Sequence, residues 1–284
     1  MATSTNAKLG LPYQGSKRRI ATRIVDLFPA APVLVDIFGG GCAVTHAALL
    51  SGKFDKVIAN DLSDAPLLFY YCAKCGVPER PRWVSRDEFF VLKDRDPLIR
   101  YCYSFGNAER AYLYGRDIEP LKRAAHRTVV DGDYSLLPVS IRGPVCETLN
   151  VITDLHERRL GWRRVIRELN GRFDLQHLEQ LEHLQRLERL ERLFISRRDY
   201  RDLYLPDDSV VYCDPPYAST SGYGIDFDHQ AFYAWCRNVG KNHRLFVSEY
   251  WMPSDFRCVD EFTVHALAGP KTNTQTRIEK IFTL

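Results

Sequence analysis

The tetrapeptide Asp214-Pro215-Pro216-Tyr217 constrains the fold of this chain more than any other stretch of its sequence. It follows Ser209-Val210-Val211-Tyr212-Cys213, a short apolar run whose β-branched residues suit a buried strand. Two consecutive prolines cannot continue the hydrogen-bond ladder of a sheet, so the predicted strand ends there. The sequence therefore predicts an acid and an aromatic ring at the carboxyl end of a strand, where open α/β sheets hold their ligands.

The chemistry of this proline corner, residues 214–217, suits the recognition of a flat base. The prolines stiffen the backbone and leave the carbonyl of Pro215 without a ladder partner. Tyr217 can then stack on the base while Asp214 and that carbonyl accept hydrogen bonds from an exocyclic amino group. An ordinary strand-ending turn is the alternative interpretation of the same residues.

A short N-terminal stretch has the composition of an anion site. Gly15 and Ser16 precede Lys17, and an apolar helical pattern follows over residues 20–28. Backbone amides at the start of a helix, together with a lysine, attract an anion. A simple helix cap has the same kind of sequence, so both interpretations stay open.

A glycine turn follows the first predicted strand. That strand, residues 33–37, carries Asp36 near its end, and residues 38–41 (Phe-Gly-Gly-Gly) lead into a predicted helix that includes residues 45–50. Glycines let the backbone turn sharply and approach a ligand closely, which is typical of sites for a nucleoside-like cofactor. The turn lacks the Lys-Ser or Lys-Thr ending of a Walker loop, and a tight packing turn is the alternative. Asp61 follows the next predicted strand about 20 residues later, where an acid meets ribose hydroxyls in nucleoside-binding βαβ units.

The rest of the chain adds strands, helices and a leucine repeat. We expect strands at residues 193–196 and 244–249, a helix at 229–239, and a terminal hairpin with arms at 259–266 and 277–284, while helical patterns cover 118–129 and 145–169. Residues 219–226, rich in Ser, Gly and Tyr, are expected to form a mobile loop beside the site. Leucines recur at every third position from Leu175 to Leu193. We expect a helix there, although this period does not match the 3.6 residues per turn of an α-helix.

Composition limits the classes of function. The chain has 284 residues, of which 45% are hydrophobic and 26% charged, as in a large globular domain or a domain with an insertion. No stretch has the length and apolarity of a membrane span or a signal peptide, so we expect an intracellular protein. The net charge of +3 is compatible with a polyanionic partner. The eight cysteines are expected to be reduced, and Cys72-x-x-Cys75 lacks a second pair, so no metal is expected.

Arginines and aromatic residues are concentrated between residues 67 and 172. Two basic clusters consist of Arg80, Arg82, Arg86, Lys93, Arg95 and Arg100, and of Arg158, Arg159, Arg163, Arg164 and Arg167, and tyrosines recur at 101, 103, 112 and 114. These residues suit a surface for phosphates and unstacked bases. They equally suit the core of a small inserted domain with solvated basic helix faces.

The order of these motifs resembles that of the Dam-type, D12 class DNA adenine methyltransferases. Four stretches carry the resemblance: Tyr13-x-Gly15-Ser16-Lys17, the acid, aromatic and glycine turn from Asp36 to Gly41, Asn60-Asp61, and the proline corner. The similarity covers residues 9–66 and 190–284. It implies a Rossmann-like, mixed and mostly parallel α/β sheet with helices on both faces, the class I methyltransferase fold. The S-adenosylmethionine-binding catalytic domain would comprise residues 1–66 and 173–284, with a mainly helical target-recognition insertion at 67–172.

The resemblance also implies roles for individual residues, with S-adenosylmethionine as the cofactor. Lys17 and the backbone from Tyr13 to Ser16 would bind its carboxylate, and Asp61 its ribose. The methionine part would lie along Asp36, Phe38, Gly39 and Gly41, and the adenine end near Asp199 or Tyr200. Catalysis would fall to Asp214, Pro215, Pro216 and Tyr217, with Asp214 also bordering the cofactor and Tyr217 stacking on a flipped base.

The expected reaction is methylation of the exocyclic amino group of adenine in double-stranded DNA. The protein would be a cytoplasmic, DNA-associated monomer or weak dimer of a bacterial or phage-infected cell, with a role in restriction-modification. An Asn-Val-Pro-x-Gly stretch of the best-known Dam enzymes is missing between residues 67 and 172, which leaves the recognised DNA sequence open. Methylation of the cytosine amino group and a catalytically inactive DNA-binding relative are the alternatives.

Overall fold

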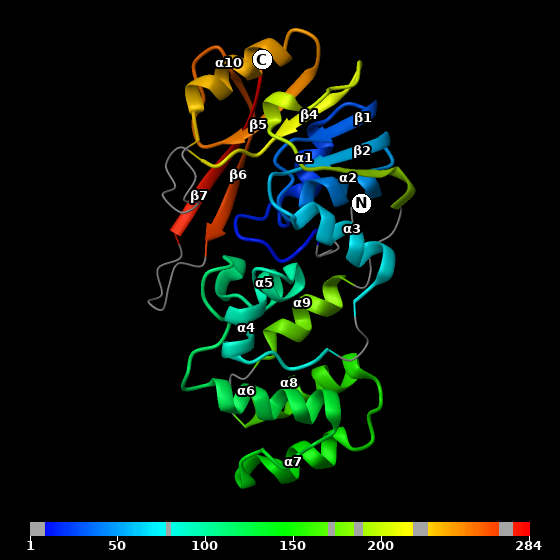
Figure 1. Cartoon of the computed structure of the whole chain (residues 1–284), viewed down its shortest axis with the longest axis vertical. Helices are drawn as coiled ribbons and strands as arrows, with labels where there is room; N and C mark the ends of the chain where they lie inside the picture. The colour runs from blue at the N-terminus through cyan, green and yellow to red at the C-terminus, as the bar shows by residue number, and fades with distance from the viewer. Residues whose placement is uncertain (1–8, 78–80, 170–173, 185–189, 218–226, 267–274) are drawn as a thin grey trace. The chain divides into compact units, whose positions relative to one another are not determined.

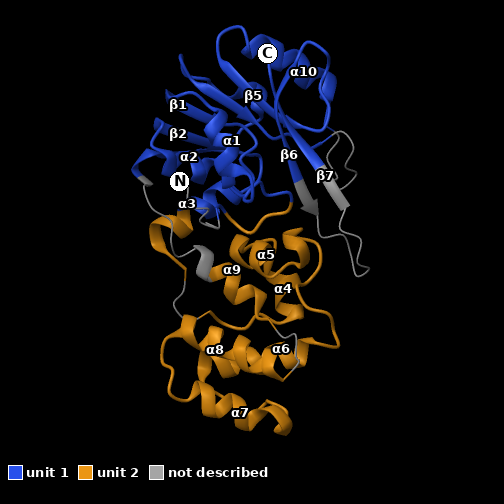
Figure 2. Cartoon of the chain, turned by 180° about the vertical axis from the view of Figure 1, so that it is seen from behind, with its two compact units in different colours: residues 1–10, 15–70, 188–284 blue, residues 11–14, 71–187 orange. Residues whose placement is uncertain are grey.

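The computed structural model describes residues 9–77, 81–169, 174–184, 190–217, 227–266 and 275–284. The chain forms two compact units, coloured separately in Figure 2. The first comprises Met1–Gly10, Gly15–Tyr70 and Glu188–Leu284, and the second Leu11–Gln14 and Tyr71–Leu187. No helix in the described part of the chain has the length and apolarity needed to cross a membrane.

A single mixed sheet organises the first unit. Among the described residues, seven strands lie in the order β3-β2-β1-β4-β5-β7-β6. The strands β1 to β5 pair in parallel, and β7 is antiparallel to both of its neighbours. Their bounds are β1 Ala31–Asp36, β2 Phe54–Asn60, β3 Leu193–Ser196, β4 Val210–Cys213, β5 Arg244–Glu249, β6 Arg257–Ala266 and β7 Gln275–Thr283. This sheet confirms the predicted mixed, mostly parallel α/β fold.

The strand order reverses between β1 and β4. From β1 the chain runs through β2 to β3 on one side, and from β4 to β5 on the other side. Connections therefore leave these two neighbours in opposite directions, and in open α/β sheets the carboxyl ends of such strands are where ligands bind. The residues that follow β1 and β4 meet at this point, and they include the glycine turn and the proline corner.

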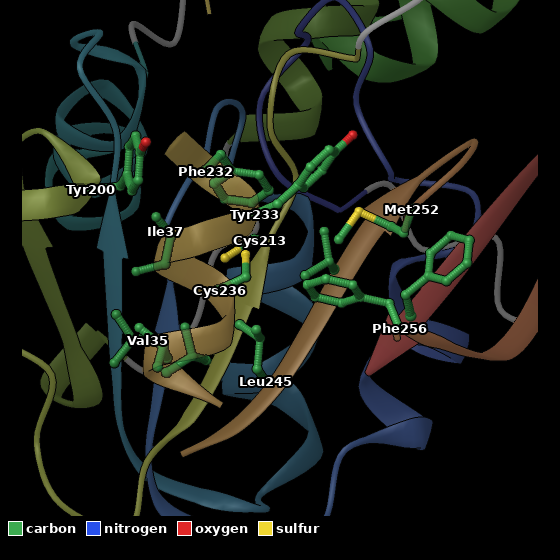
Figure 3. Close-up of a cluster of buried hydrophobic side chains, with 14 residues drawn as sticks. Val35, Ile37, Tyr200, Cys213, Phe232, Tyr233, Cys236, Leu245, Met252 and Phe256 are labelled. Atoms are coloured by element: carbon green, nitrogen blue, oxygen red, sulfur yellow. The ribbon is translucent and has the colours of Figure 1, made fainter. Parts of the chain in front are cut away.

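Helices cover the sheet because alternate strand residues face opposite sides. On one side, Val211 and Leu245 join Phe232 and Cys236 of α10 (His229–Val239) in a buried cluster, part of which Figure 3 labels. On the other side, the ring of Phe28, just after α1 (Ala21–Leu27), lies 5.6 Å from Tyr212 and 4.8 Å from Phe246. The unit also contains α2 (Ala43–Ser51), the 3₁₀ turns η3 (Leu190–Arg192) and η4 (Tyr200–Asp202), and the start of α3 (Ala65–Cys75).

The second unit is mainly helical within its described residues (Figure 1). It contains α4 Arg86–Leu92, α5 Pro97–Cys102, α6 Glu119–His126, α7 Val139–Leu149, α8 Leu155–Glu168 and α9 Gln176–Leu184, with a 3₁₀ turn at Phe105–Asn107 and a π turn at Arg127–Asp131. Trp162 is fully buried in a cluster with Val145, Leu149 and Val165. Its own core gives this unit the character of a separate domain.

The predicted helix at 145–169 is wrong in its continuity. Helix α7 ends at Leu149, and α8 begins after Asp154, whose carboxylate accepts a hydrogen bond from the amide of Glu157. This N-cap satisfies an otherwise unpaired amide and fixes a new helix start. The helical pattern at 118–129 likewise passes from α6 into a π turn after His126.

The leucine repeat forms an α-helix over only part of its length. Helix α9 spans Gln176–Leu184, and Leu175, Leu178 and Leu181 are buried at its start. Leu175 and Leu178 pack into the core of the second unit, so this unit extends beyond the expected boundary at residue 172. The repeat ends at Leu193, where β3 begins. Residues 185–189 lie outside the described part of the chain.

Candidate active site

The proline corner begins where β4 ends, at Cys213. Its neighbour β1 ends at Asp36, in register two residues before Asp214, since Asp36 pairs with Tyr212. Asp36, Asp61 and Asp214 lie close enough that the charges of Asp61 and Asp214 raise the pKa of Asp36, and the charge of Asp61 raises that of Asp214. Three acids predicted from separate strand ends therefore gather at the switch point of the sheet.

Lys17 lies at the proline corner. Its Nζ is 2.8 Å from Oδ1 of Asp214, 3.6 Å from Oε2 of Glu279 on β7, and 4.8 Å from the centroid of the Tyr217 ring. The side chains of Lys17, Asp214 and Glu279 are 7%, 19% and 13% exposed. A buried ammonium between two carboxylates and over a ring is a strongly coupled cluster, because little water screens the charges.

Burial and ion pairing act on the titration of this cluster in opposite directions. Burial raises the pKa of Asp214, and the adjacent Lys17 ammonium only partly offsets this. Burial lowers the pKa of Lys17, but the carboxylates of Asp214 and Glu279 outweigh that effect, so the pKa of Lys17 rises above its ordinary value. Lys17 is therefore a permanent cation at neutral pH, and Asp214 is its nearest acceptor.

Aromatic rings extend the corner. The ring of Tyr217 packs edge-on against Tyr250 with 4.6 Å between centroids. Tyr250 directly follows Glu249, the last residue of β5, which is buried and accepts a hydrogen bond from the amide of Tyr250. Sequence reasoning did not single out Glu279, Glu249 or Tyr250 as site residues. Their signal is positional, since Glu249 and Tyr250 lie at the end of β5, the neighbour of β4, and Glu279 lies on β7 next to Lys280, which pairs with Glu249.

Asp36 is held by the first turn of α2. One of its carboxylate oxygens, Oδ2, accepts hydrogen bonds from the amide and the hydroxyl of Thr45 at 3.2 and 2.7 Å. The other oxygen, Oδ1, is buried and has no hydrogen-bond partner among the described residues. Burial raises the pKa of Asp36 to about 7, although the bonds from Thr45 oppose the rise. A buried acceptor of this kind suits a cationic or N–H-bearing ligand.

The glycine turn and Asp61 are joined by hydrogen bonds. The amide of Gly40 donates to Oδ2 of Asp61 at 2.9 Å, and the amide of Gly39 donates to the carbonyl of Asn60 at 2.7 Å. A Cβ on Gly39 would lie 3.3 Å from the carbonyl oxygen of Asn60, so the close approach of the two strand ends favours glycine there. Gly41 is buried, and the next residue, Cys42, adopts the left-handed conformation before α2 starts.

Phe38, the first residue of this turn, packs against Tyr200, which follows Asp199. The ring of Phe38 is 5.5 Å from that of Tyr200 and 5.8 Å from those of Phe227 and Phe232. The carboxylate of Asp199 forms hydrogen bonds and an ion pair with Arg201, whose bonds lower the pKa of Asp199 to about 2. Phe38 and Tyr200 thus form an aromatic wall, whereas Asp199 is already paired.

The remaining predicted site residues are dispersed. Gly15 is exposed and Ser16 is half-buried. Tyr13 belongs to the second unit, where its ring lies 5.5 Å from that of Tyr101. The expected loop at 219–226 lies outside the described residues. Within the described residues, no group of three or more His, Cys, Asp or Glu side chains is positioned to hold a metal ion.

The aromatic residues of the second unit form its core. Tyr101, Tyr103, Tyr112 and Tyr114 are all less than 5% exposed, whereas Phe105 is 68% exposed. The hydroxyls of Tyr103 and Tyr112 donate to the carbonyls of Arg82 and Val84. Of the two interpretations left open by the sequence, the core of an inserted domain therefore describes these four tyrosines.

Part of the basic clusters is also structural. Arg158 donates hydrogen bonds to the carbonyls of Thr128, Val129, Leu149 and Ile152, and Arg159 is buried. Arg164 and Arg167 are exposed on the same helix, and so is Arg95 in the first cluster. Among the members of the two clusters that the structure describes, the exposed ones are accessible to a phosphate from solvent.

Comparison with known proteins gives one family match and several similar solved structures, of which two are described. Residues 13–93 match the model of the D12 class N6 adenine-specific DNA methyltransferase family. No curated protein sequence matches the chain. Among solved structures, the rRNA methyltransferase aviRa from Streptomyces viridochromogenes is similar at 14% identity and a TM-score of 0.40, over 99% of this chain and 90% of that one. The putative methyltransferase yhhF from Escherichia coli is similar at 8% identity and a TM-score of 0.34, over 97% and 90%.

Proposed function

We propose that this chain methylates the exocyclic N6 of adenine in double-stranded DNA, with the target base flipped out of the helix. The match of residues 13–93 to the D12 class N6 adenine-specific DNA methyltransferase family supports this proposal. The observation that carries the proposal is the convergence of the proline corner, Asp36 and the Asp61-linked glycine turn at the switch point of the sheet. Such switch points bind nucleoside-like ligands in open α/β sheets. The acceptor end of the site therefore adjoins the cofactor end.

The geometry around Asp36 supports S-adenosylmethionine as the cofactor. The unpartnered, buried Oδ1 of Asp36 would accept a hydrogen bond from the cofactor's amino group, and Phe38, Gly39 and Gly41 would line its methionine part. Asp61, already bonded to the amide of Gly40, would accept from the ribose, and Tyr200 would flank the adenine end. Gly15, Ser16 and Lys17 keep their proposed role near the carboxylate, which would share the Lys17 ammonium with Asp214. When bound, the cofactor supplies a methyl group on a sulfonium.

The chain's own contribution to the chemistry is to activate the amine. The lone pair of the adenine N6 is shared with the ring, so the amine is a poor nucleophile. Asp214 and the Pro215 carbonyl would each accept one N–H, which draws the nitrogen towards tetrahedral geometry and localises its lone pair. Methyl transfer from the bound cofactor to this nitrogen would break the cofactor's carbon–sulfur bond, and the nitrogen would pass its surplus proton to solvent. Asp214 stabilises the positive charge that develops on the nitrogen, and Tyr217 holds the base plane.

We further propose that residues 71–187 recognise the DNA. The exposed arginines of this unit, with Arg164 and Arg167 as examples, would contact phosphates, while its core positions them. A DNA substrate places the working protein in the DNA-containing compartment of its cell, and a monomer or weak dimer remains our expectation.

The test is nucleoside analysis of DNA treated with the full-length protein and S-adenosylmethionine. We expect N6-methyladenine, and we expect Asp214→Ala to abolish it while DNA binding is largely retained. Asp207→Ala, in the exposed turn before β4, is the matched control and should methylate normally. N4-methylcytosine as the sole product would favour the cytosine alternative. No methylated base, or full activity in Asp214→Ala, would refute the proposal.

A further inference from the structure

The third charge of the active-site cluster has no role in the reaction described above. Glu279 comes from β7, the antiparallel strand next to β5, and its carboxylate lies 3.6 Å from the Lys17 ammonium. The side chain is 13% exposed, so it is a largely buried carboxylate rather than a surface one. Burying a charge is costly unless a partner compensates it, and the Asp214–Lys17 pair would be balanced without Glu279.

The arrangement presents a conflict over Asp214. Lys17 holds Oδ1 of Asp214 at 2.8 Å, which is a full charge-assisted hydrogen bond. The target amine needs the same carboxylate as its acceptor. If the Lys17 ammonium stayed hydrogen-bonded to Asp214, it would compete with the target amine for that carboxylate. It would also repel the positive charge that develops on the amine. Lys17 therefore needs a second ion-pair partner.

Glu279 is the second partner that the protein itself supplies, in addition to the cofactor carboxylate proposed above. A movement of about 1 Å would bring the Lys17 ammonium from its present distance to hydrogen-bond length from Glu279. The ring of Tyr217, 4.8 Å from the same ammonium, flanks it and stabilises the cation. No proton or covalent bond moves in this exchange, since the ammonium changes only its nearest carboxylate.

We propose, on the premise of the methyltransferase function above, that Glu279 is a positioning residue that takes Lys17 from Asp214 when the target amine enters. Asp214 is then released as an acceptor, and the combined charge of Lys17, Asp214 and Glu279 is −1 at the moment when the amine becomes cationic. Without Glu279 the combined charge would be zero.

Several ionisable groups surround this exchange. Asp36 ends β1, Asp61 follows β2, Tyr212 lies on β4, Tyr217 belongs to the corner, and Glu249 ends β5. Each interacts electrostatically with one or more of Lys17, Asp214 and Tyr217. These five groups remain unchanged in the Glu279 variants below. A shift in pH dependence between those variants therefore reports the charge at residue 279.

The experiment compares Glu279→Gln, which removes the charge but keeps the shape, with Glu279→Asp, which keeps the charge. The control is Glu261→Gln on β6, whose carboxylate is 52% exposed and pairs with Lys280. For each full-length protein we would measure kcat, the KM for DNA, the affinity for S-adenosylmethionine, the melting temperature and the pH dependence of kcat.

We expect Glu279→Gln to lower kcat about tenfold or more, since a tenfold change corresponds to one pKa unit of interaction between charged groups. The affinities for DNA and for S-adenosylmethionine should change little. The acid limb of its kcat profile should move to lower pH. Lys17 would no longer be shared with a second carboxylate, so it would lower the pKa of Asp214 more strongly. Glu279→Asp should retain the wild-type limb, and Glu261→Gln should behave as wild type throughout.

Two outcomes would overturn the inference. If Glu279→Gln and Glu279→Asp lower the melting temperature equally, with kcat per folded molecule and the acid limb unchanged, Glu279 is structural only. If the wild-type chain methylates adenine, Asp214→Ala is inactive and Glu279→Gln has wild-type kinetics, this inference fails while the proposed function stands. Absence of methylation by the wild-type chain would refute both the proposed function and the role of Glu279.

Discussion

At the scale of single residues, Asp36 combines two opposing demands. Its carboxylate is fully buried, and burial raises its pKa to about 7. The usual value is 3.8, so above neutral pH the folded protein keeps an ionised group in a place that favours the neutral form. The unpartnered oxygen is nevertheless what a cofactor amino group requires. Stability and binding should therefore respond to the same substitution with opposite signs.

The prediction concerns Asp36→Asn, which keeps the shape and the acceptor for Thr45. At pH 8 the ligand-free variant should be more stable than wild type by about 1–3 kcal/mol, because no buried charge remains. Its affinity for S-adenosylmethionine should fall about tenfold or more, since a charge-assisted hydrogen bond becomes a neutral one. Urea unfolding and calorimetric titration measure the two effects. Loss of both stability and affinity would show that Asp36 is a structural ion.

At the scale of elements, the strands around the site follow from the sequence, whereas the partners of the site do not. Short apolar runs that end in Asp36, Asp61 and Asp214 predict β1, β2 and β4, because strand residues, turn glycines and prolines act locally. The position of Glu279 depends on β7 inserting between β5 and β6. That is a long-range property of the sheet, and a single glutamate in a β-pattern carries no sign of it.

The same limit applies to the basic clusters. Charge composition cannot distinguish an arginine that contacts solvent from Arg158, which joins the π turn, the end of α7 and the turn before α8 through four backbone carbonyls. Carbonyls at helix ends lack partners within their helix, and Arg158 donates to several of them, including that of Leu149, which also accepts from the amide of Ile152. The leucine repeat shows a related limit. The sequence predicts a helix there, and α9 forms one over Gln176–Leu184, but the packing of α9 against its neighbours decides which leucines are buried.

A pair of substitutions in α8 tests this division of roles. Arg158→Met should destabilise the second unit by about 2–4 kcal/mol, because it removes hydrogen bonds to four part-buried carbonyls. Arg167→Ala, in the exposed last turn of the same helix, should leave stability within about 0.5 kcal/mol of wild type and reduce DNA affinity. Thermal unfolding and binding at several salt concentrations distinguish them. Equal stability of the two variants would contradict the structural role of Arg158.

At the scale of the whole molecule, both units bury histidines, but only the first unit's active site adds buried carboxyl groups with raised pKa values among the residues described. In the second unit, Nδ1 of His126 lies 2.9 Å from Nε2 of His177, and Nδ1 of His177 lies 2.6 Å from the hydroxyl of Tyr114. Burial lowers the pKa of His126 to about 4 and that of His177 well below its ordinary 6.5. In the first unit, burial likewise lowers the pKa of His46 to about 4, but it raises those of Asp36 and Asp214.

These groups predict that mild acid weakens the second unit first. A histidine whose folded pKa lies below its unfolded value of about 6.5 contributes stability that is present above that pH and lost as the pH falls. Between pH 6.5 and 5 the loss is about 1–2 kcal/mol for His126, and His177, whose pKa is also lowered by burial, adds to it. Asp36, whose folded pKa is raised, binds its proton in the folded state first, so the first unit gains stability over the same interval and offsets the loss from His46.

Hydrogen exchange at pH 7 and pH 5, corrected for the intrinsic pH dependence of exchange, measures the two units separately in the intact chain. We expect protection to fall in α6, α8 and α9 while β1, β2 and β4 keep theirs. The variant His126→Gln keeps a polar side chain that does not titrate, so it should narrow the difference between the two pH values. If β1 and β4 lose protection first, the acids of the active site are ionised in the folded protein well below neutral pH, which would also contradict the behaviour expected of Asp36→Asn.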